Sequence, residues 1–253
     1  MQFLILINYN APELIELWLE NIRDAKSTIN VILVNNSPEK DEFLKNLDDV
    51  FYYIEDAHNN GYASAVNSGF RVVDQSEAVV AVVNPDISPN ATALQEMMEL
   101  VGDDEIISPQ VANSFTGEIE IAPMFGNFYS EIINRILRRR LNYNLSTNYQ
   151  SFSGSCWVCK KSTFNKIGVM YNQGFLYGEE REYSYRAKLL GVSVKIISGI
   201  RFVHKTSYSV TKSITKAKKE NLRFKNMLDF YERQTLSPST KLIIQITRFL
   251  FLK

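Results

Sequence analysis

The first half of the chain alternates short, continuous apolar runs with stretches in which apolar residues recur every three or four positions. The continuous runs indicate strands that are buried on both faces, and the periodic stretches indicate helices packed against such a sheet. This alternation favours an α/β fold with a mostly parallel, Rossmann-like central sheet and helices on both faces. The strands are expected at residues 2–7, 30–34, 51–54 and 78–83, and the helices at 12–24, 39–47, 62–73 and 90–101.

The second half of the chain has a less regular pattern. Residues 123–150 show little periodicity apart from a possible helix at 129–141. The remaining strands are expected at residues 106–111, 118–121, 151–158, 192–197 and 200–203, and the remaining helices at 161–167, 179–190 and 211–234.

The charge distribution separates the end of the chain from the rest. The formal net charge is zero, which does not indicate a nucleic-acid-binding domain. Residues 211–253 nevertheless carry ten Lys or Arg against three acidic residues, which leaves eighteen against twenty-five in residues 1–210. We therefore expect one domain over residues 1–210 and a basic helical C-terminal extension over 211–253 that meets an anionic surface.

The last residues of this extension are amphipathic. Residues 242–252 are apolar except for Gln245 and Arg248, which recur with Lys241 at helical spacing. Eleven residues are too few to span a bilayer, which needs roughly 20. The pattern fits a helix lying in a membrane interface, and the alternative is a helix that packs back on the domain.

Two cysteines, Cys156 and Cys159, form a C-x-x-C motif. A zinc site around them would have to recruit carboxylates, because the chain has only these two cysteines and two histidines. We expect both to be small buried residues, and so few cysteines agree with a reducing cytosol. The apolar residues 3–7 lack a basic leader and a small-residue cleavage site, so we expect a first strand there rather than a signal peptide.

Polar residues follow several of the expected strands at the point where each strand ends. Because the carboxyl ends of parallel strands meet at one edge of a sheet, these side chains are expected to converge on a ligand site. They are, in chain order, Asn8, Tyr9, Asn10, Asn35, Asn84 and Asp86.

A turn that contains glycine precedes the expected helix at 62–73. Asn60 and Gly61 would leave backbone N–H groups and the positive end of the helix dipole facing a diphosphate, and the alternative is a plain capped helix. Neither a P-loop nor a G-x-G-x-x-G fingerprint is present in the sequence. Their absence argues against a nucleotide triphosphatase and against a dinucleotide-dependent oxidoreductase.

The order of these motifs resembles the family 2 glycosyltransferases of the GT-A fold, particularly bacterial rhamnosyltransferase-like enzymes of surface polysaccharide synthesis. The resemblance covers about residues 1–210. Its motifs are Asn8-Tyr9-Asn10, Val34-Asn35-Asn36-Ser37, Asn59-Asn60-Gly61-Tyr62-Ala63-x-x-x-Asn67-x-Gly69, Asn84-Pro85-Asp86, Gly154-Ser155, residues 175–180 with Arg186, and His204-x-x-x-x-Ser209.

The resemblance implies a nucleotide site at the ends of the first strands. Asn35 departs from the Asp that the family more often has, and an amide offers donors as well as an acceptor. The implied nucleotide-binding residues are Asn8, Tyr9, Asn10, Asn35, Asn60, Gly61, Asn67 and Asn84.

The resemblance also implies a divalent metal. Asn84-x-Asp86 stands in the place of the family's Asp-x-Asp motif, with Asp86 as the direct ligand of Mg²⁺ or Mn²⁺. Such an ion would neutralise the charge of a departing nucleoside diphosphate. His204 would supply a further metal contact, and the alternative is a structural histidine with satisfied hydrogen bonds.

Three acidic residues, Glu179, Glu180 and Glu182, lie at the expected start of a helix, where the dipole favours them in any case. By the resemblance, Glu180 stands for the family's Asp and is the base that removes a proton from the acceptor hydroxyl. Glu182 and Arg186, four residues apart, are expected to form an ion pair worth about 0.2–0.5 kcal/mol.

The sugar site is expected near a residue without a side chain, which lets a ligand approach the backbone. Trp157 and Tyr177 would stack on sugar faces, and the alternative is that they are core aromatics. The implied donor and acceptor sugar residues are Gly154, Ser155, Trp157, Tyr177 and Glu179.

The resemblance to the family implies an inverting glycosyltransferase. It would move a sugar, rhamnose or a hexose, from a dTDP or UDP donor to a hydroxyl of a glycan or lipid-linked acceptor at the cytoplasmic face of the cell membrane, with peripheral attachment through the tail. The alternative is a catalytically silent nucleotide-sugar binding or scaffold protein, because Asn35, Asn84 and Glu180 all depart from the commoner acids.

Overall fold

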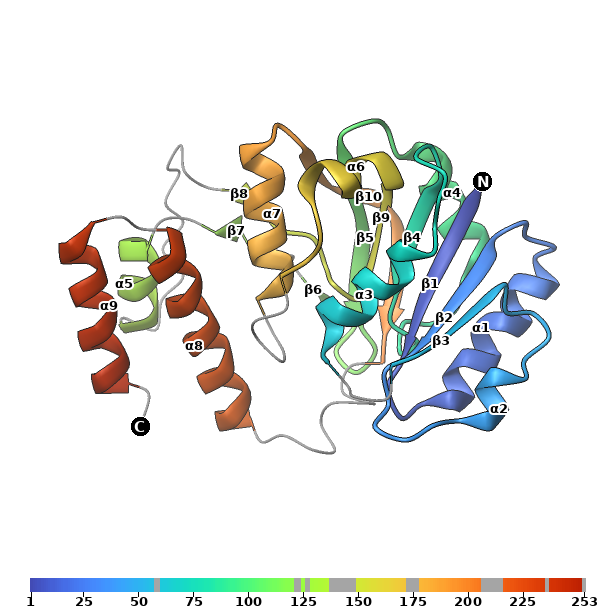
Figure 1. Ribbon diagram of the computed structural model, residues 1–253, viewed down its shortest axis with the longest axis horizontal. Coiled ribbons are helices and arrows are strands. Elements are labelled where there is room, and N and C mark those ends of the chain that lie inside the picture. The colour runs from blue at the N-terminus through green and yellow to red at the C-terminus, as the bar shows by residue number, and fades with distance from the viewer. Residues whose placement is uncertain are drawn as a thin grey trace.

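A mixed eight-stranded sheet forms the centre of the described part of the protein (Figure 1). The computed structural model describes residues 1–56, 60–120, 124–125, 128–136, 149–171, 178–205, 216–234 and 237–251. The strands are β1 (Gln2–Asn8), β2 (Asn30–Asn35), β3 (Tyr52–Glu55), β4 (Val79–Val83), β5 (Glu105–Asn113), β6 (Ile119–Glu120), β7 (Met124–Phe125), β8 (Tyr149–Gln150), β9 (Cys156–Lys160) and β10 (Ser193–His204).

The strand order in this sheet is β10-β5-β9-β4-β1-β2-β3, and β6 pairs with the outer part of β5. Strands β4, β1, β2 and β3 run parallel to one another, and β10 runs parallel to β5. Only β9 and the short β6 are antiparallel to their neighbours among the described strands of this sheet. The predicted mostly parallel α/β fold is therefore confirmed, and the carboxyl ends of β1, β2 and β4 lie along one edge.

Helices cover both faces of the sheet. They are α1 (Pro12–Asp24), α2 (Glu42–Lys45), α3 (Tyr62–Arg71), α4 (Ala91–Leu100), α5 (Phe128–Ile136), α6 (Lys161–Ile167), α7 (Glu179–Leu189), α8 (Lys216–Gln234) and α9 (Pro238–Phe251). Alternate residues of β1 serve the two layers: Leu4 and Leu6 pack under α1 and α4, while Phe3 and Ile5 pack with α3 and α7. This two-sided burial explains why the strand is apolar throughout.

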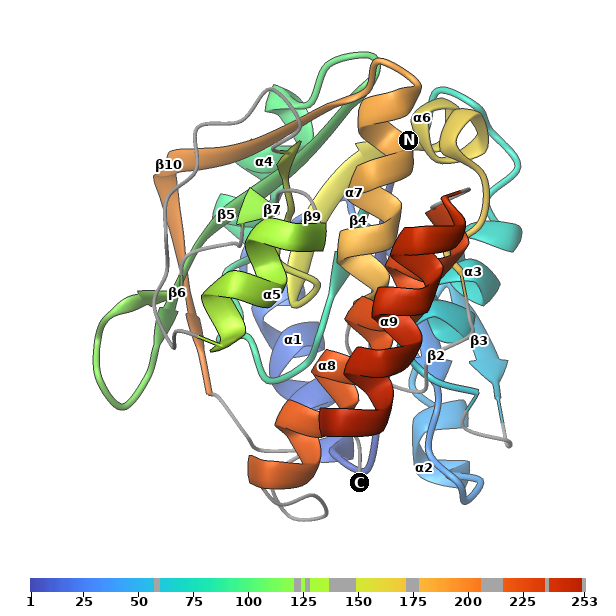
Figure 2. The same cartoon turned by 90° about the vertical axis from the view of Figure 1, so that its left-hand side faces the viewer.

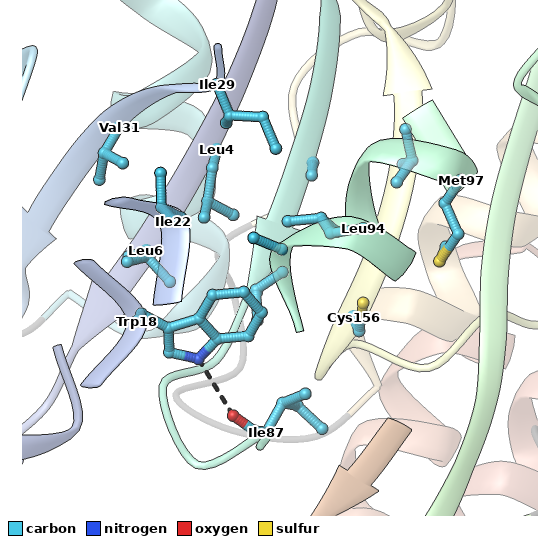
Figure 3. Packing of buried hydrophobic residues seen from close by; sticks show 14 of the residues in the cluster. Leu4, Leu6, Trp18, Ile22, Ile29, Val31, Ile87, Leu94, Met97 and Cys156 are labelled. Atoms are coloured by element: carbon cyan, nitrogen blue, oxygen red, sulfur yellow. Dashed lines mark hydrogen bonds between the residues drawn. The ribbon is translucent and has the colours of Figure 1, made fainter. Parts of the chain in front are cut away.

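Helix α1 shows how the sequence pattern produces one of these layers. Four large apolar residues recur at helical spacing and are buried, namely Ile15, Trp18, Leu19 and Ile22. The indole Nε1 of Trp18 donates a hydrogen bond to the carbonyl oxygen of Ile87 at 3.0 Å (Figure 3). The largest side chain of the helix is thus both packed and paired.

Some element boundaries differ from those predicted. The helix predicted at 39–47 is only α2, because Asp41 is extended and its side chain accepts hydrogen bonds from the N–H groups of Phe43 and Leu44. The two strands predicted at 192–197 and 200–203 are one long strand, β10, with an irregular register between Ile197 and Arg201. Its pairing with β5 on both sides of that irregularity keeps it continuous.

Helices α5, α8 and α9 lie together at the end of the molecule beyond α7 (Figure 1), and this end faces the viewer in Figure 2. Their buried residues form a third apolar cluster. One face of α9 packs on this cluster through Ile244. Arg248 of α9 pairs with Asp229 and Glu232 of α8, which joins the two helices by charge. The cluster contains Phe128 of α5, Phe224, Met227, Leu228, Phe230 and Tyr231 of α8 and Ile244 of α9, with Ile132 of α5 and Tyr185 of α7 against it.

The opposite face of α9 is apolar and exposed. Among the described residues, no helix is both long enough and apolar enough to cross a membrane. The two roles considered for the tail therefore concern different faces of one helix, since one face packs back on the protein and the other remains open. The exposed apolar residues of α9 are Leu242, Ile243, Ile246, Phe249 and Leu250.

Both cysteines are buried free thiols in β9, as predicted. Burial raises the pKa of both thiols well above the usual range, so they stay protonated at neutral pH. Cys156 and Cys159 therefore act as small packing residues.

Candidate functional site

The ends of β1 and β2 are joined by their own asparagine side chains. Asn8 donates a hydrogen bond from Nδ2 to Oδ1 of Asn35 at 2.9 Å and another to the hydroxyl of Ser37 at 3.1 Å. Asn35 in turn donates from Nδ2 to the Glu55 carboxylate at 3.0 Å. Both asparagines are buried, so their amides hold this edge of the sheet together. Their predicted contacts with a nucleotide remain a prediction.

Tyr9 and Asn10 are the members of this motif that reach the surface. Asn10 is exposed and has a φ of +53°, a left-handed conformation that asparagine tolerates better than most residues. The backbone N–H of Asn10 donates to the Ser37 hydroxyl at 2.9 Å, which fixes the turn. Tyr9 is half-buried beside it. A ligand at this edge would meet Tyr9 and Asn10 before it met Asn8.

The start of α3 is built around a glycine. Gly61 has a φ of +89° and precedes the first turn, and among the described residues no side chain caps that turn. Asn60 donates from Nδ2 to the carboxylate of Asp56 at 3.0 Å. The first N–H groups of α3 are therefore the kind of donors that suit an anion.

Asn67 lies further along α3, and its side chain is hydrogen-bonded to the backbone of Met170. Its Nδ2 donates to the carbonyl oxygen of Met170, and its Oδ1 accepts from the N–H of Met170, both at 2.8 Å. This pair of bonds ties α3 to the chain that follows α6. Its predicted contact with a nucleotide is untested, and the side chain has a clear structural role.

The predicted metal residues Asp86 and His204 lie side by side. Asp86 follows β4 and His204 ends β10, and an isolated β-bridge between Ile87 and His204 brings the two segments together. Oδ2 of Asp86 is 3.4 Å from Nε2 of His204. Oδ1 of Asp86 is buried and has no hydrogen-bond partner among the described residues. An unsatisfied buried carboxylate oxygen beside an imidazole nitrogen fits a divalent cation.

Glu120 is a further member of this group that the motifs did not indicate. Its Oε2 lies 3.1 Å from Nδ1 of His204, on the other side of the ring from Asp86. Glu120 is on β6, which pairs with β5 and so folds back beside the end of β10. The strand predicted at residues 118–121 was the only signal, and no motif spacing linked Glu120 to His204.

The charges around His204 favour its protonated form. Burial lowers the pKa of the imidazole, but hydrogen bonds to Asp86 and Glu120 and the charges of those carboxylates outweigh it and raise the pKa to about 9. A cation at this site would compete with that proton. The described residues contain no group of three or more His, Cys, Asp or Glu that could hold a metal, so an ion bound by Asp86 and His204 would need further oxygens from ligand or water.

The predicted base, Glu180, lies in the first turn of α7 against Gly154. A Cβ atom added to Gly154 would overlap the carboxylate of Glu180, so only glycine allows this approach. Burial raises the pKa of Glu180, and backbone N–H groups and the charge of Arg223 oppose that rise. A carboxylate with a raised pKa holds a proton more readily, which suits a proton acceptor in catalysis.

The aromatic residues around Gly154 belong to the core. Trp157 is fully buried, stacks on Phe70 with ring centroids 5.8 Å apart, and donates from Nε1 to the hydroxyl of Tyr62 at 2.9 Å. That hydroxyl donates to the carbonyl oxygen of Gly154. The structure thus places Trp157 as a core aromatic, the alternative to sugar stacking, and Tyr177 lies outside the described residues.

The remaining residues at the start of α7 are largely buried. Glu179 is buried, and the predicted ion pair between Glu182 and Arg186 is confirmed, with Nε of Arg186 2.7 Å from Oε1 of Glu182. Arg186 also donates to the carbonyl oxygens of Ile167 and Val169. This pair therefore ties α7 to the end of α6.

A backbone hydrogen bond joins the segment that carries Asp86 to the segment that contacts Glu180. The N–H of Asn84 donates to the carbonyl oxygen of Ser155 at 2.9 Å, and Ser155 follows the glycine that contacts Glu180. The hydroxyl of Ser155 is paired with that of Ser153. Asp86 and Glu180 therefore lie at the same carboxyl edge of the sheet, where α/β proteins bind ligands.

A mostly parallel sheet with such an edge is typical of α/β proteins, which as a class bind ligands at the strand ends. The chain belongs to glycosyl transferase family 2, whose family model matches residues 3–168. The resemblance drawn from the motifs is thereby confirmed. The match ends before α7, so Glu180 and His204 lie beyond it.

One curated relative and two solved structures are informative. The low-salt glycan biosynthesis hexosyltransferase Agl10 of Haloferax volcanii is 25% identical over 206 residues, which are 79% of this chain and 66% of that protein. The chain thus spans about two thirds of the length of this relative.

The mannosyltransferase PcManGT from Pyrobaculum calidifontis, solved with GDP-Man and Mn²⁺, has a TM-score of 0.57 at 15% identity over 98% of this chain and 69% of its own. GalNAc-T7, solved with UDP, GalNAc and Mn²⁺, has a TM-score of 0.58 at 13% identity over 92% of this chain and 47% of its own. These likenesses show the GT-A glycosyltransferase fold.

Proposed function

We propose that this protein is an inverting glycosyltransferase that moves a sugar from a nucleotide-diphosphate donor to an acceptor hydroxyl. Its family supports the reaction class, and its relative Agl10 is named a hexosyltransferase. The observation that carries the proposal is the carboxylate of Glu180, held against Gly154 at the same sheet edge as Asp86 and His204.

In the proposed reaction, Glu180 accepts the proton of the acceptor hydroxyl as that oxygen attacks the anomeric carbon of the donor sugar. The bond from the anomeric carbon to the diphosphate oxygen breaks, and the nucleoside diphosphate leaves with the bonding electrons. Direct displacement on the opposite face inverts the anomeric configuration. The burial that raises the pKa of Glu180 also makes it a stronger base than an exposed carboxylate.

A divalent metal belongs to this proposal. Asp86 and His204 would hold it, and its charge would stabilise the departing diphosphate. The structures of PcManGT and GalNAc-T7 contain Mn²⁺, and carboxylate and imidazole ligands accept either Mn²⁺ or Mg²⁺. Glu120 would fix the ring of His204 through Nδ1, as carboxylates beside metal-bound histidines do.

The donor and acceptor are proposed from the motifs. The Asn84-Pro85-Asp86 variant resembles the rhamnosyltransferase subgroup, so the proposed donor is dTDP-rhamnose, with a UDP-hexose as the second donor. The proposed acceptor is a glycan or a lipid-linked sugar of surface polysaccharide. A lipid-linked acceptor agrees with the exposed apolar face of α9, which would lie in the cytoplasmic face of the cell membrane.

Ligand-dependent stability tests the nucleotide site directly. Purified protein is melted with UDP, dTDP and GDP, each with and without Mn²⁺ or Mg²⁺, because a ligand that binds only the native state raises the melting temperature. We expect a rise with dTDP or UDP that is larger when metal is present. No rise with any nucleotide would refute the nucleotide site.

Transfer assays with matching nucleotide sugars then distinguish an enzyme from a silent binder. An increase in melting temperature without any transfer or donor hydrolysis would favour the silent binding protein over the transferase.

A further inference from the structure

Helix α7 carries Glu180 and is held between two apolar layers. Tyr183 and Ala187 of α7 pack with the sheet, while Tyr185 packs against the C-terminal helices. Figure 1 shows α7 between the sheet and the pair α8 and α9. The position of Glu180 therefore depends on contacts with both sides.

A buried ionic cluster fixes the C-terminal side of this contact. Arg181, the residue after Glu180, pairs with Glu131 of α5, and the two side chains are only 7% and 16% exposed. Arg181 also donates to the hydroxyl of Tyr231 on α8 at 2.9 Å. The Tyr231 hydroxyl donates to the same oxygen of Glu131 at 2.6 Å. Three helices thus meet in one set of charge-assisted hydrogen bonds.

Aromatic rings complete the surroundings of the guanidinium. Its central carbon lies 5.0 Å from the ring centroid of Phe230 and 4.9 Å from that of Tyr231. Both contacts are within the range of a cation–π interaction. Arg181 is therefore held from several directions, whereas apolar side chains of the same volume would pack without a preferred direction.

Stability alone does not explain this arrangement. Apolar residues of similar volume often replace a buried ion cluster without loss of stability, so such a cluster is better evidence for specificity of position. The residue that this cluster positions is the neighbour of Glu180, whose carboxylate has room only because Gly154 lacks a side chain. Helix α8 also packs close to Gly178, which precedes α7, through Asn226.

We infer that Arg181 is a positioning residue for the transfer reaction: held by Glu131 and Tyr231, it fixes the first turn of α7 so that the Glu180 carboxylate stays at Gly154. The inference rests on the proposed role of Glu180 as the base. It makes α8, which lies outside the part matched by the family model, necessary for a competent site.

The test replaces the whole cluster by apolar residues in the variant Arg181→Met/Glu131→Met/Tyr231→Phe. This change leaves no buried charge unpaired within the cluster, so we expect a melting temperature close to that of the wild type. We expect kcat to fall about tenfold or more because the carboxylate is no longer held in place, with donor affinity unchanged. Hydrogen exchange of the first-turn amides of α7 should become faster.

The control variant is Ile244→Ala, which weakens the same helical cluster from α9 and leaves Arg181, Glu131 and Tyr231 in place. It should lower the melting temperature and leave kcat unchanged at temperatures well below the melt. If the triple variant does not fold, Tyr231→Phe alone should reduce kcat and speed exchange in the first turn of α7 more than Ile244→Ala does.

Wild-type kcat and wild-type exchange in the cluster variant, or in Tyr231→Phe where that variant replaces it, would overturn the inference. Failure of the proposed function is a separate result, since the wild type itself would then transfer no sugar while the exchange measurement would still report on the position of α7.

Discussion

At the scale of single residues, the site depends on side chains whose partners come from distant parts of the chain. The sequence correctly placed polar residues at the strand ends, because parallel strands bring their carboxyl ends to one edge. It did not show that Asn8 and Asn35 hydrogen-bond each other or that Asn67 holds Met170. Such pairs follow from strand register and helix placement, which no local motif records.

Gly154 offers a prediction at this scale. Gly154→Ala should lower kcat about a hundredfold, since the new methyl group must displace the Glu180 carboxylate. The melting temperature should change little because the displaced atoms are the end of a flexible side chain. The control is Gly199→Ala, where an added Cβ meets no atom within 4 Å among the described residues. Steady-state kinetics measure kcat for both variants. Equal kcat values would contradict a functional contact between Gly154 and the Glu180 carboxylate.

Glu120 offers a second prediction. Glu120→Gln should weaken Mn²⁺ binding about 10- to 100-fold, because the amide no longer fixes His204 as the carboxylate does. Titration of Mn²⁺ followed by electron paramagnetic resonance measures this affinity without any turnover. Glu118→Gln on the same hairpin is the control, since Glu118 is exposed. An unchanged Mn²⁺ affinity in Glu120→Gln would show that Glu120 does not support metal binding.

At the scale of elements, periodicity predicted the first five strands and helices α1, α3 and α4 well, because each of these helices buries a face whose spacing is visible in the sequence. Boundaries that depend on tertiary pairing were less predictable. Strand β10 continues through an irregularity because β5 pairs on both sides of it. Helix α2 is short because Asp41 caps it late.

Helix α1 carries a prediction on stability. Trp18→Phe should lower the free energy of unfolding by about 1–3 kcal/mol, because the buried carbonyl oxygen of Ile87 loses its indole donor. Denaturant unfolding measures the change. Leu17→Ala on the exposed side of the same helix should change stability by less than about 0.5 kcal/mol. If the two variants were equally stable, the bond shown in Figure 3 would contribute nothing.

At the scale of the whole molecule, the chain has a row of polar side chains at the strand ends and an apolar helix face at its far end. The sequence predicted both features, but it left open whether the tail packs on the protein or faces outward. The structure shows that α9 does both, through Ile244 on one side and Phe249 on the other. Charge and periodicity show that a helix has an apolar face. Which surface covers that face depends on the neighbouring helices, which the local sequence does not record.

The exposed face of α9 predicts membrane binding. The variant Ile246→Gln/Phe249→Gln/Leu250→Gln should bind anionic vesicles about 10³-fold more weakly or worse, since each of the three exposed apolar side chains contributes roughly 1.5–3 kcal/mol when fully buried. Vesicle co-sedimentation measures the change. Phe115→Gln, at an exposed position of a distant hairpin, should have no effect. Equal vesicle binding by the α9 variant and the wild type would show that the exposed face of α9 does not bind the membrane.

The central claim is that Glu180 accepts the proton of the acceptor, and the variant Glu180→Gln tests it most directly. Its amide keeps the shape of the side chain and cannot act as the base. We expect kcat for sugar transfer to fall about 10²- to 10⁴-fold, while the affinity for the nucleotide donor stays at the wild-type value. Sugar transfer at the wild-type rate by Glu180→Gln would contradict the account.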